Sequence, residues 1–367
     1  MTSIRIAQVC PRYAPFIGGI ETHVRAISER LVKHGFEVEV LTTDPSRKLP
    51  SIATLNGVAI RRFTSWAPSE SYYFSPRLDK FLARNMMRYD AVHAHNYHAF
   101  PALYAAKNAG EAFFFSPHYH GRGHTRFRDF LHRPYKIISR RIFEKASRIL
   151  CVSEFEKNLI KRDFQVDETR TVCIRNGIDV NEFRSTTRCT KKVNQILCVA
   201  RLEKYKGIHY LISALRDLSG FRLEVVGKGP YKKTLAKLAE ELDVEDRVSI
   251  SADLEREELL RKYREAGVFC LLSEFEASGI AVLEALASGT PAVVANTSAL
   301  SELVDNVNCF GVDLPPKGEC LTHLIQTTTG REVQDTVFPT WDDAADAVAR
   351  LYLEDIDSRP AKLCCRS

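Results

Sequence analysis

Two glutamates in the second half of the chain carry the clearest chemical pattern in the sequence. Glu276 and Glu284 are eight positions apart, and Ser278 and Gly279 lie between them. An uninterrupted apolar run before this pair predicts a buried parallel strand, and apolar residues at helical spacing from Ile280 onward predict a helix. Such a helix presents unpaired backbone N–H groups at the carboxyl edge of the sheet, where an anion can bind.

The residue types around this turn indicate what kind of anion would bind. Backbone N–H groups at a helix N-terminus suit a phosphate, whereas carboxylates accept hydrogen bonds from hydroxyl groups. A ligand that is part phosphate and part polyhydroxyl would use both, and a nucleotide-sugar is such a ligand. The alternative is an amphipathic helix with two ordinary surface glutamates.

Two basic residues follow another expected strand, at residues 195–200. Arg201 and Lys206 stand in the sequence R-L-E-K-Y-K-G, which places both on a loop at the carboxyl edge of the sheet. An arginine offers a planar pair of donors to a diphosphate, and a lysine offers a compact positive charge. Taken alone, the pair could equally be two surface cations. Beside Glu276 and Glu284, it predicts a site for a diphosphate.

Length and composition restrict the class of protein. A chain of 367 residues with 45% hydrophobic and 27% charged residues predicts two globular domains. No apolar run approaches the roughly 20 residues of a membrane span, and the N-terminus reads as a strand rather than a signal peptide. Most of the ten cysteines stand singly in apolar strands. We therefore expect reduced core cysteines and a cytoplasmic protein.

The charge is unevenly divided between the two halves. Residues 1–187 hold 29 Lys and Arg against 18 Asp and Glu, whereas the remainder holds 23 against 28. A basic first half suggests an anionic partner. Because no nucleic-acid motif accompanies it, an anionic membrane surface is the stronger candidate and nucleic acid is not expected.

The first half alternates strands and helices from its beginning. A strand over 4–10 leads through a loop containing Gly18 and Gly19 to a helix over 20–34. Residues without Cβ let the backbone approach a phosphate, although Gly-Gly is also a common tight turn. Further strands are expected over residues 36–41, 89–93, 112–116, 149–152 and 172–174. This rhythm predicts a doubly wound α/β sheet with ligands at the carboxyl ends of its strands.

Polar residues cluster after these strands. His95, His118, His120 and Asn176 each follow an expected strand closely, on the edge where ligands bind. Such a histidine is either a hydrogen-bonded loop residue or a group that contacts the ligand. For His118, two positions after its strand, we favour ligand contact; for His95 and His120 both interpretations stay open.

A basic segment over 121–148 interleaves cations with aromatic and aliphatic residues. It contains nine Lys and Arg against two acidic residues: Arg122, Arg126, Arg128, Arg133, Lys136, Arg140, Arg141, Lys145 and Arg148. This composition suits a membrane-interfacial segment or a groove for an anionic acceptor. A solvated helix face over the core would have the same pattern, and the sequence does not separate the two.

The second half repeats the alternation after a polar linker over 184–194. Expected strands over 195–200, 221–226 and 248–251 lead to the glutamate motif. The turn G-K-G, which begins at Gly227, is compatible with a nucleotide contact or with an ordinary turn. After Val312 the sequence lacks an evident closing helix until Trp341. Asp355 and Asp357 formally spell D-x-D, but they end a terminal helix, so no metal site is expected.

These motifs together resemble the retaining glycosyltransferases of family four. The resemblance rests on the E-x7-E spacing, on E-A-L-A-S-G-T-P-A-V-V (284–294) and on R-L-x-x-x-K-G, and it covers most of the chain. It implies the GT-B fold: two Rossmann-like doubly wound α/β domains that face across a cleft, with a last helix that crosses back to the first domain. The domains would be 1–187 for the acceptor, 188–340 for the donor and 341–367 for the returning helix.

The resemblance also implies a function and a set of site residues. The chain would move a hexosyl group, with retention, from a nucleotide-diphosphate sugar to a lipid, lipid-linked or saccharide acceptor in glycan or cell-envelope synthesis. No cofactor or metal would take part. The catalytic residues would be Arg201, Lys206, His118 and Glu276, and the donor-binding residues Gly18, Gly19, Gly227, Ser278, Gly279, Ile280 and Glu284.

Two other classes of function keep the same fold. A nucleotide-sugar epimerase or hydrolase would act on the donor without an acceptor and would need a poised base. A non-catalytic nucleotide-sugar-binding protein would be expected to lack Arg201, Lys206 or Glu276, all of which are present. The basic first half further predicts a cytoplasmic enzyme with peripheral contact to the membrane.

Overall fold

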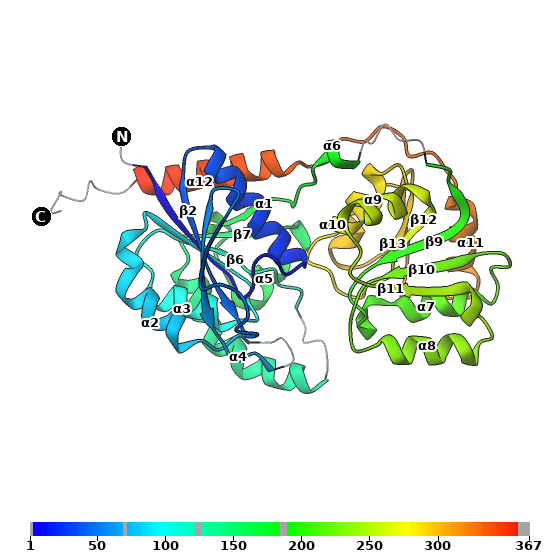
Figure 1. Cartoon of the computed structure of the whole chain (residues 1–367), viewed down its shortest axis with the longest axis horizontal. Coiled ribbons are helices and arrows are strands. Elements are labelled where there is room, and N and C mark those ends of the chain that lie inside the picture. Colours follow the sequence, from blue (N-terminus) through cyan, green and yellow to red (C-terminus); the bar gives the residue numbers. More distant parts are fainter. Residues whose placement is uncertain (1–2, 69–71, 122–125, 184–188, 359–367) are drawn as a thin grey trace, which may run out of the picture. The chain divides into compact units, whose positions relative to one another are not determined.

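The chain folds into two compact units (Figure 1). The computed structural model describes residues 3–68, 72–121, 126–183 and 189–358, with the backbone alone for 126–134. Unit 1 comprises Met1–Gly177 and Trp341–Ser367, and unit 2 comprises Ile178–Thr340. The chain enters unit 2 before the expected division at 187/188, because Ile178 and Phe183 already pack against Leu260 and Leu283 of unit 2.

Unit 1 is built on an eight-stranded sheet with the strand order β3-β4-β2-β1-β5-β6-β7-β8. Strand β3 runs antiparallel to β4, and the other neighbours are parallel. The strands are β1 (Arg5–Val9), β2 (Glu37–Asp44), β3 (Ile52–Leu55), β4 (Val58–Thr64), β5 (Ala91–His95), β6 (Phe113–Ser116), β7 (Arg148–Cys151) and β8 (Thr171–Cys173).

Helices cover both faces of this sheet. On one face, α1 (Gly19–Lys33) and α12 (Trp341–Asp357) lie side by side (Figure 1), joined by an ion pair of 2.7 Å between Arg30 and Asp342. The last helix therefore belongs to unit 1. The other face buries apolar side chains against α2 (Pro76–Asn85), α3 (Phe100–Asn108), α4 (Arg126–Lys145) and α5 (Glu154–Phe164).

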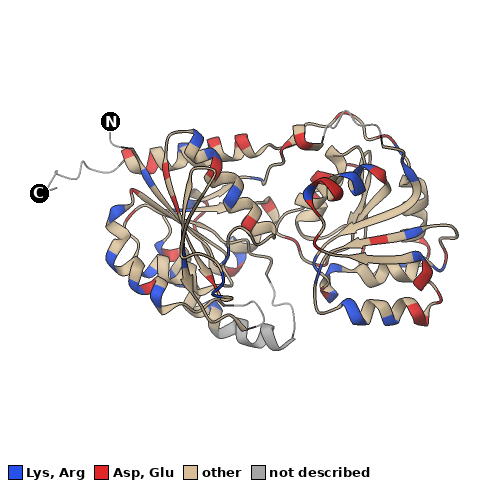
Figure 2. Cartoon of the chain, viewed as in Figure 1, with Lys and Arg blue, Asp and Glu red and all other residues tan. Residues whose placement is uncertain are grey.

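Unit 2 holds a six-stranded parallel sheet with the order β11-β10-β9-β12-β13-β14. Its strands are β9 (Lys192–Val199), β10 (Arg222–Val226), β11 (Val248–Ser251), β12 (Ala266–Leu271), β13 (Ala292–Ala295) and β14 (Cys309–Val312). Its helices are α6 (Val180–Phe183), α7 (Ile208–Ala214), α8 (Lys232–Glu241), α9 (Arg256–Glu265), α10 (Ile280–Ala287) and α11 (Cys320–Thr328). The outer helix α8 carries charges of both signs (Figure 2).

The structure corrects several sequence-based boundaries. Strand β5 extends to His95, so this residue lies inside the strand rather than after it. Helix α11 occupies the segment after Val312 that showed no evident helix. This helix has a modest apolar face, and its Leu321 and Ile325 are buried against the core of unit 2. Such a face is enough to stabilise the helix because it packs against the sheet. Among the described residues no helix is both long and apolar enough to cross a membrane.

Candidate active site

The site of unit 2 lies where the strand order of its sheet reverses. Strand β9 has β10 on one side and β12 on the other, so the chain winds away from β9 in both directions. In open α/β sheets, ligands bind at the carboxyl ends of the strands beside this point. Arg201 and Lys206 follow β9, whereas Glu276 and Gly279 follow β12. The fold thus brings two loops, 70 residues apart in the chain, to one edge.

Lys206 and Glu276 form a nearly buried ion pair at this edge. Lys206 Nζ donates to Glu276 Oε1 at 2.5 Å, and the two side chains are only 12% and 16% exposed. The Glu276 loop is held in turn, because its backbone N–H donates to Ser298 Oγ at 3.1 Å. Burial is the largest single effect and lowers the pKa of Lys206, but the Glu276 carboxylate and Tyr205 together outweigh it, so the pKa is raised. Lys206 is therefore a fixed positive charge at neutral pH.

Arg201 is the exposed cation of the same edge. Its side chain is 55% exposed and makes an ion pair of 3.4 Å with Glu203. An exposed surface pair of this kind contributes about 0–1 kcal/mol, so an incoming anion could compete for the guanidinium at little cost. Arg201 is thus accessible to a ligand, whereas Lys206 is held in place.

Two glycines of this edge are required by close backbone packing. Gly207 has φ of +68°, and a Cβ there would overlap the carbonyl oxygen of Leu272. A Cβ on Gly227 would likewise overlap the carbonyl oxygen of Ala200. The glycine in R-L-x-x-x-K-G therefore lets the loop after β9 lie against the end of β12. Gly227 is expected to contact the donor, and the structure shows that backbone packing by itself requires a glycine at this position.

Helix α10 begins at the turn that the sequence predicted. Gly279 is its N-cap residue and provides no side-chain cap, and Ile280 is its first residue. A Cβ on Gly279 would overlap Cδ1 of Leu303, so this position is also tightly packed. The helix directs its N-terminal backbone toward the sheet edge beside Ser278, as an anion site requires.

Glu284 contacts partners that the sequence did not reveal. Its Oε1 accepts from Arg256 Nη1 at 2.9 Å, and its Oε2 accepts from the Tyr263 hydroxyl at 3.0 Å. Arg256 also pairs with Glu182 at 2.7 Å. Burial raises the pKa of Glu284, against the lowering effect of Arg256. Within the described residues, no hydrogen bond or ion pair joins Glu284 to Lys206. Each carboxylate oxygen keeps a second acceptor position for a ligand hydroxyl.

In unit 1, the glycine loop lies at the corresponding edge, between β1 and α1. Gly18 is the N-cap residue of α1 with an extended φ of 178°, which any residue can adopt. A Cβ there would overlap the carboxylate of Glu21, which pairs with Arg12 at 2.8 Å. A Cβ on Gly19, in contrast, would meet no atom within 4 Å. Gly19 therefore borders open space, and Gly18 lies against a partly buried ion pair.

A histidine cluster stands next to this loop. His95 of β5 and His118 after β6 lie beside His23 of α1, with ring centroids 5.4 and 4.9 Å from that of His23. Asn176 joins them through its Oδ1, which is 2.7 Å from His23 Nδ1. The structure thus brings together three residues singled out from the sequence. Sequence reasoning missed His23, although its place in the first turn after Gly18–Gly19 indicated the same edge.

Burial controls the charge of these histidines. It lowers the pKa of His23 to about 4 and holds the pKa values of His95 and His118 well below their usual range. All three are neutral at pH 7. His120 lies apart from this trio, stacked on His98 with centroids 5.1 Å apart. The neutral imidazoles can accept hydrogen bonds or bind a metal ion, but they do not supply positive charge.

A buried glutamate holds the loop that carries His118. Glu156 is fully buried; its Oε1 accepts from the backbone N–H of Tyr119 at 2.5 Å, and its Oε2 accepts from that of Val152 at 2.7 Å. His118 itself has φ of +49°, an uncommon conformation for a residue other than glycine. Glu156 therefore joins the loops after β6 and β7, and it fixes the backbone next to His118.

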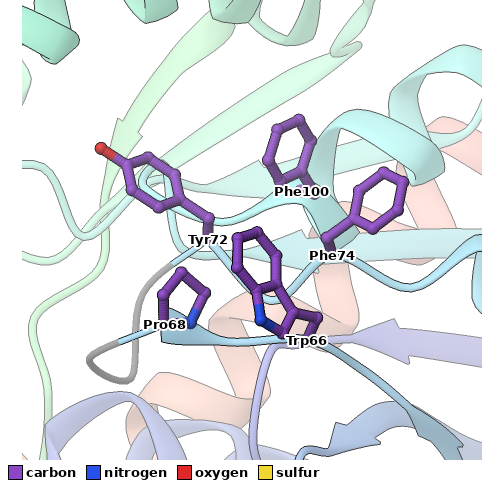
Figure 3. A pocket seen from close by; sticks show the side chains of 5 residues that line it. All are labelled: Trp66, Pro68, Tyr72, Phe74 and Phe100. Atoms are coloured by element: carbon purple, nitrogen blue, oxygen red, sulfur yellow. The ribbon is translucent and has the colours of Figure 1, made fainter.

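An apolar pocket of about 360 Å³ lies elsewhere in unit 1 (Figure 3). It is lined by Trp66, Pro68, Tyr72, Phe74 and Phe100. The backbones of Trp66 and Phe74 pair through two hydrogen bonds of 2.9 Å, and the rings of Phe74 and Phe100 lie 5.8 Å apart. Trp66 is 70% exposed and Phe74 is 45% exposed. Exposed aromatic rings around a hollow are a typical contact surface for an apolar ligand.

The basic segment is only partly visible in the structure. Residues 122–125 and the side chains of 126–134, including Arg122, Arg126, Arg128 and Arg133, lie outside the described part. In the remainder of α4, Ile137 and Ile138 are 76% and 48% exposed. Near them, Arg140 pairs with Glu144 at 3.3 Å. Adjacent exposed isoleucines are unusual on a solvated helix face and favour an interface.

The two α/β sheets, with the candidate site residues at their carboxyl edges, have the two-domain GT-B fold. Two family models match the chain: Glycosyltransferase Family 4 over residues 17–182, and Glycosyl transferases group 1 over residues 179–315. The chain therefore belongs to the group 1 glycosyltransferases of family four.

Individual proteins agree with this assignment. A glycosyltransferase of Methanocaldococcus jannaschii, itself uncharacterised, is 27% identical, with 82% of this chain and 83% of that protein covered. Sucrose-phosphate synthase of Thermosynechococcus elongatus has the same fold, with a TM-score of 0.77, 18% identity and coverage of 97% and 100%. Anabaena HepE, solved with UDP-glucose, has a TM-score of 0.70, 17% identity and coverage of 96% and 97%.

Proposed function

We propose that this glycosyltransferase moves a hexosyl group, with retention, from a nucleotide-diphosphate sugar to a lipid-linked acceptor. The observation that carries this proposal is the Lys206–Glu276 pair beside Arg201 at the point where the sheet order reverses. One edge of unit 2 thereby holds two cations for a diphosphate and a carboxylate for sugar hydroxyls. The UDP-glucose bound to Anabaena HepE, which has the same fold, supports a donor of this class.

The proposed chemistry depends on charge that grows during the reaction. As the bond to the sugar breaks, negative charge accumulates on the leaving diphosphate and the sugar gains oxocarbenium character. Arg201 and Lys206 stabilise that charge more in the transition state than in the ground state, as do the backbone N–H groups near Gly279. In this proposal they take the place of a divalent metal, so transfer does not require one.

The remaining site residues position the donor. Glu276 orients the sugar hydroxyls, and Glu284 accepts from the ribose while Arg256 and Tyr263 hold its carboxylate. From unit 1, Gly18 and Gly19 approach the diphosphate and His118 contacts the sugar. Retention is part of this proposal and is supported by the resemblance to the retaining family; NMR of the anomeric proton in the first-formed product would test it.

The surface of unit 1 supports the choice of a lipid-linked acceptor. The pocket around Trp66 offers apolar rings to a lipid chain, whereas a free saccharide would also need polar partners there. Exposed Ile137 and Ile138 on α4 add a second apolar feature beside basic residues. We propose a cytoplasmic enzyme that contacts the membrane peripherally.

Transfer assays in excess EDTA test the proposal against its alternatives. A set of nucleotide-sugars is first compared by thermal shift, because a ligand at 100 times its dissociation constant stabilises by about 2.7 kcal/mol. The stabilising donor is then incubated alone and with lipid-linked acceptors. Product only with acceptor supports transfer, product from donor alone indicates an epimerase or hydrolase, and binding without product indicates a binding protein. A requirement for added Mn²⁺ or Mg²⁺ would contradict metal independence.

A further inference from the structure

Three buried ring nitrogens converge in unit 1 without a partner. Nε2 of His23, Nδ1 of His95 and Nε2 of His118 make no hydrogen bond within the described structure. The three residues are 4%, 0% and 9% exposed, so water reaches them poorly. A ring nitrogen from each lies within 4.8 Å of one from each of the others. Buried polar atoms are normally satisfied, so three such atoms in one place point to a ligand.

Neighbouring side chains determine which nitrogen of His95 can accept. Gln8 Nε2 donates to the Tyr352 hydroxyl at 3.1 Å, which leaves Gln8 Oε1 as an acceptor 2.7 Å from His95 Nε2. His95 Nε2 must therefore carry the proton. In the neutral ring, His95 Nδ1 then bears the lone pair, and this is the nitrogen that lacks a partner.

A neighbouring oxygen also determines which nitrogen of His23 can accept. Its Nδ1 lies 2.7 Å from Asn176 Oδ1, which can only accept, so Nδ1 carries the proton and Nε2 bears the lone pair. His23 Nε2 and His95 Nδ1 therefore both bear lone pairs and cannot donate to one another. A neutral His118 with its proton on Nε2 could donate to at most one of them, so a donor or a cation from outside is needed to satisfy both.

We propose that His23, His95 and His118 form a binding site for one divalent transition-metal ion of the Zn²⁺ type. Metal-bound histidines generally donate their other ring N–H to an oxygen, as His23 does to Asn176 and His95 does to Gln8. Zn–N bonds of about 2.0–2.1 Å would require these nitrogens, which lie within 4.8 Å of one another, to move closer together. Imidazole ligands favour Zn²⁺, Ni²⁺ or Cu²⁺, whereas Mg²⁺ prefers oxygen.

The ion would be inhibitory rather than catalytic. This consequence rests on the proposed function, in which His118 contacts the donor sugar. An ion bound to the His118 nitrogen would occupy the group that the donor needs. Transfer should then proceed in EDTA and fall when Zn²⁺ fills the site, and His23→Gln, which removes a ligand not assigned to the donor, should reduce this inhibition.

Equilibrium dialysis of the full-length, metal-free protein against Zn²⁺ tests the site directly. We expect one equivalent bound with a dissociation constant of micromolar or below, and no comparable binding of Mg²⁺. His23→Gln, His95→Gln and His118→Gln should each weaken binding by at least about tenfold. His209→Gln is the matched control, because His209 also has an unpartnered buried nitrogen but belongs to unit 2, outside the cluster.

The possible outcomes separate this inference from the proposed function. Circular dichroism checks that each variant folds, and His118→Gln, in a loop, remains informative if the core variant His95→Gln does not fold. The inference is overturned if no tight site exists, or if the three variants bind Zn²⁺ as the control does. Transfer without tight Zn²⁺ binding would support the proposed function and contradict the metal site. Tight Zn²⁺ binding without transfer to any acceptor would support the metal site and contradict the proposed function.

Discussion

At the scale of single residues, the two cations of unit 2 differ in how strongly the protein holds them. Lys206 is nearly buried and paired with Glu276, whereas Arg201 is exposed and makes only a surface ion pair. Removing one partner of a buried pair leaves an unpaired charge, which is costly. In the proposed function, Lys206 both binds the diphosphate and maintains the loop geometry, whereas Arg201 only binds the diphosphate.

Removal of either cation should slow the chemical step. Arg201→Ala and Lys206→Ala each remove a charge that interacts most strongly with the leaving diphosphate, so kcat should fall by roughly 10²–10³-fold. Lys204→Ala, an exposed cation of the same turn, is the control and should keep kcat within about twofold. Steady-state kinetics measure the effect. A raised KM with unchanged kcat in both cation variants would contradict it.

Glu284 should instead affect binding. The ribose that Glu284 is proposed to contact does not change during the reaction. Glu284→Gln should therefore mainly raise KM for the donor, and it should weaken binding of the nucleotide product to a similar extent. Tyr263→Phe, which leaves the carboxylate in place, should have a smaller effect. Kinetics and nucleotide titration measure both constants. Loss of kcat with unchanged nucleotide affinity would assign Glu284 to the chemical step.

At the scale of elements, unit 1 buries polar side chains between its sheet and the pair α1 and α12. Tyr352 of α12 contacts Gln8 of β1 at 3.1 Å and His93 Nδ1 of β5 at 2.6 Å, while His93 Nε2 lies 2.9 Å from Ser116 Oγ. The returning helix is therefore held by directional bonds as well as apolar contacts. Such a network specifies one packing arrangement, because a shifted helix would leave buried groups unpaired.

These buried histidines should make unit 1 sensitive to acid. Burial lowers the pKa of His23, His93, His95 and His118 in the folded state. Below about pH 6.5 the unfolded chain gains protons that the folded chain does not, so the unfolding free energy falls as pH falls. The loss is up to about 1.4 kcal/mol per pH unit per histidine. Burial raises the pKa of Glu156 to about 8, so the folded chain binds a proton there more readily than the unfolded chain does. Glu156 therefore adds stability as pH falls, but this one glutamate acts against four histidines.

Urea midpoints at pH 7, 6 and 5 measure this dependence. Both tryptophans, Trp66 and Trp341, belong to unit 1, so their fluorescence reports on that unit. His95→Asn should flatten the decline with pH, and the exposed His323→Gln in unit 2 should leave it unchanged. A midpoint that stays constant from pH 7 to pH 5 would show that the histidines are accessible to protons in the folded state.

At the scale of the whole molecule, positive charge and exposed apolar side chains suggest which unit contacts a membrane. The first 187 residues carry the excess of positive charge, and the described part of α4 exposes Ile137 and Ile138. Anionic lipid attracts basic segments over about one Debye length, and exposed apolar side chains add insertion at the interface. Unit 1 is therefore the half that we expect to meet a membrane.

Binding to lipid vesicles should follow from this arrangement. Co-sedimentation should need anionic lipid and should weaken as salt rises from 0.05 to about 0.5 M, since the Debye length is about 10 Å at 0.1 M. Ile137→Ser with Ile138→Ser should weaken it, whereas exposed Val337→Ser in unit 2 should not. Equal binding to neutral vesicles, or none to anionic ones, would argue against the membrane contact.

Much of the fold was determined by the sequence itself. Alternation of buried strands and amphipathic helices has a local physical cause, since each element must bury one face, and it indicated both α/β sheets. The turn before α10 and the loop after β9 were located correctly, because Gly279 and Gly207 stand where side chains would clash. The α11 segment was missed, because a short helix with a small apolar face depends on the sheet beneath it.

Only the tertiary structure decided which side chains meet. The Lys206–Glu276 bond joins residues 70 positions apart, and the bond from Arg256 to Glu284 depends on how α9 packs on α10. The place of His23 just after Gly18–Gly19 indicates the sheet edge at which it lies, but its contact with His95 and His118 requires the strand order of unit 1. Local patterns specify elements, whereas buried pairs depend on the order in which strands assemble, and that order is a property of the whole chain.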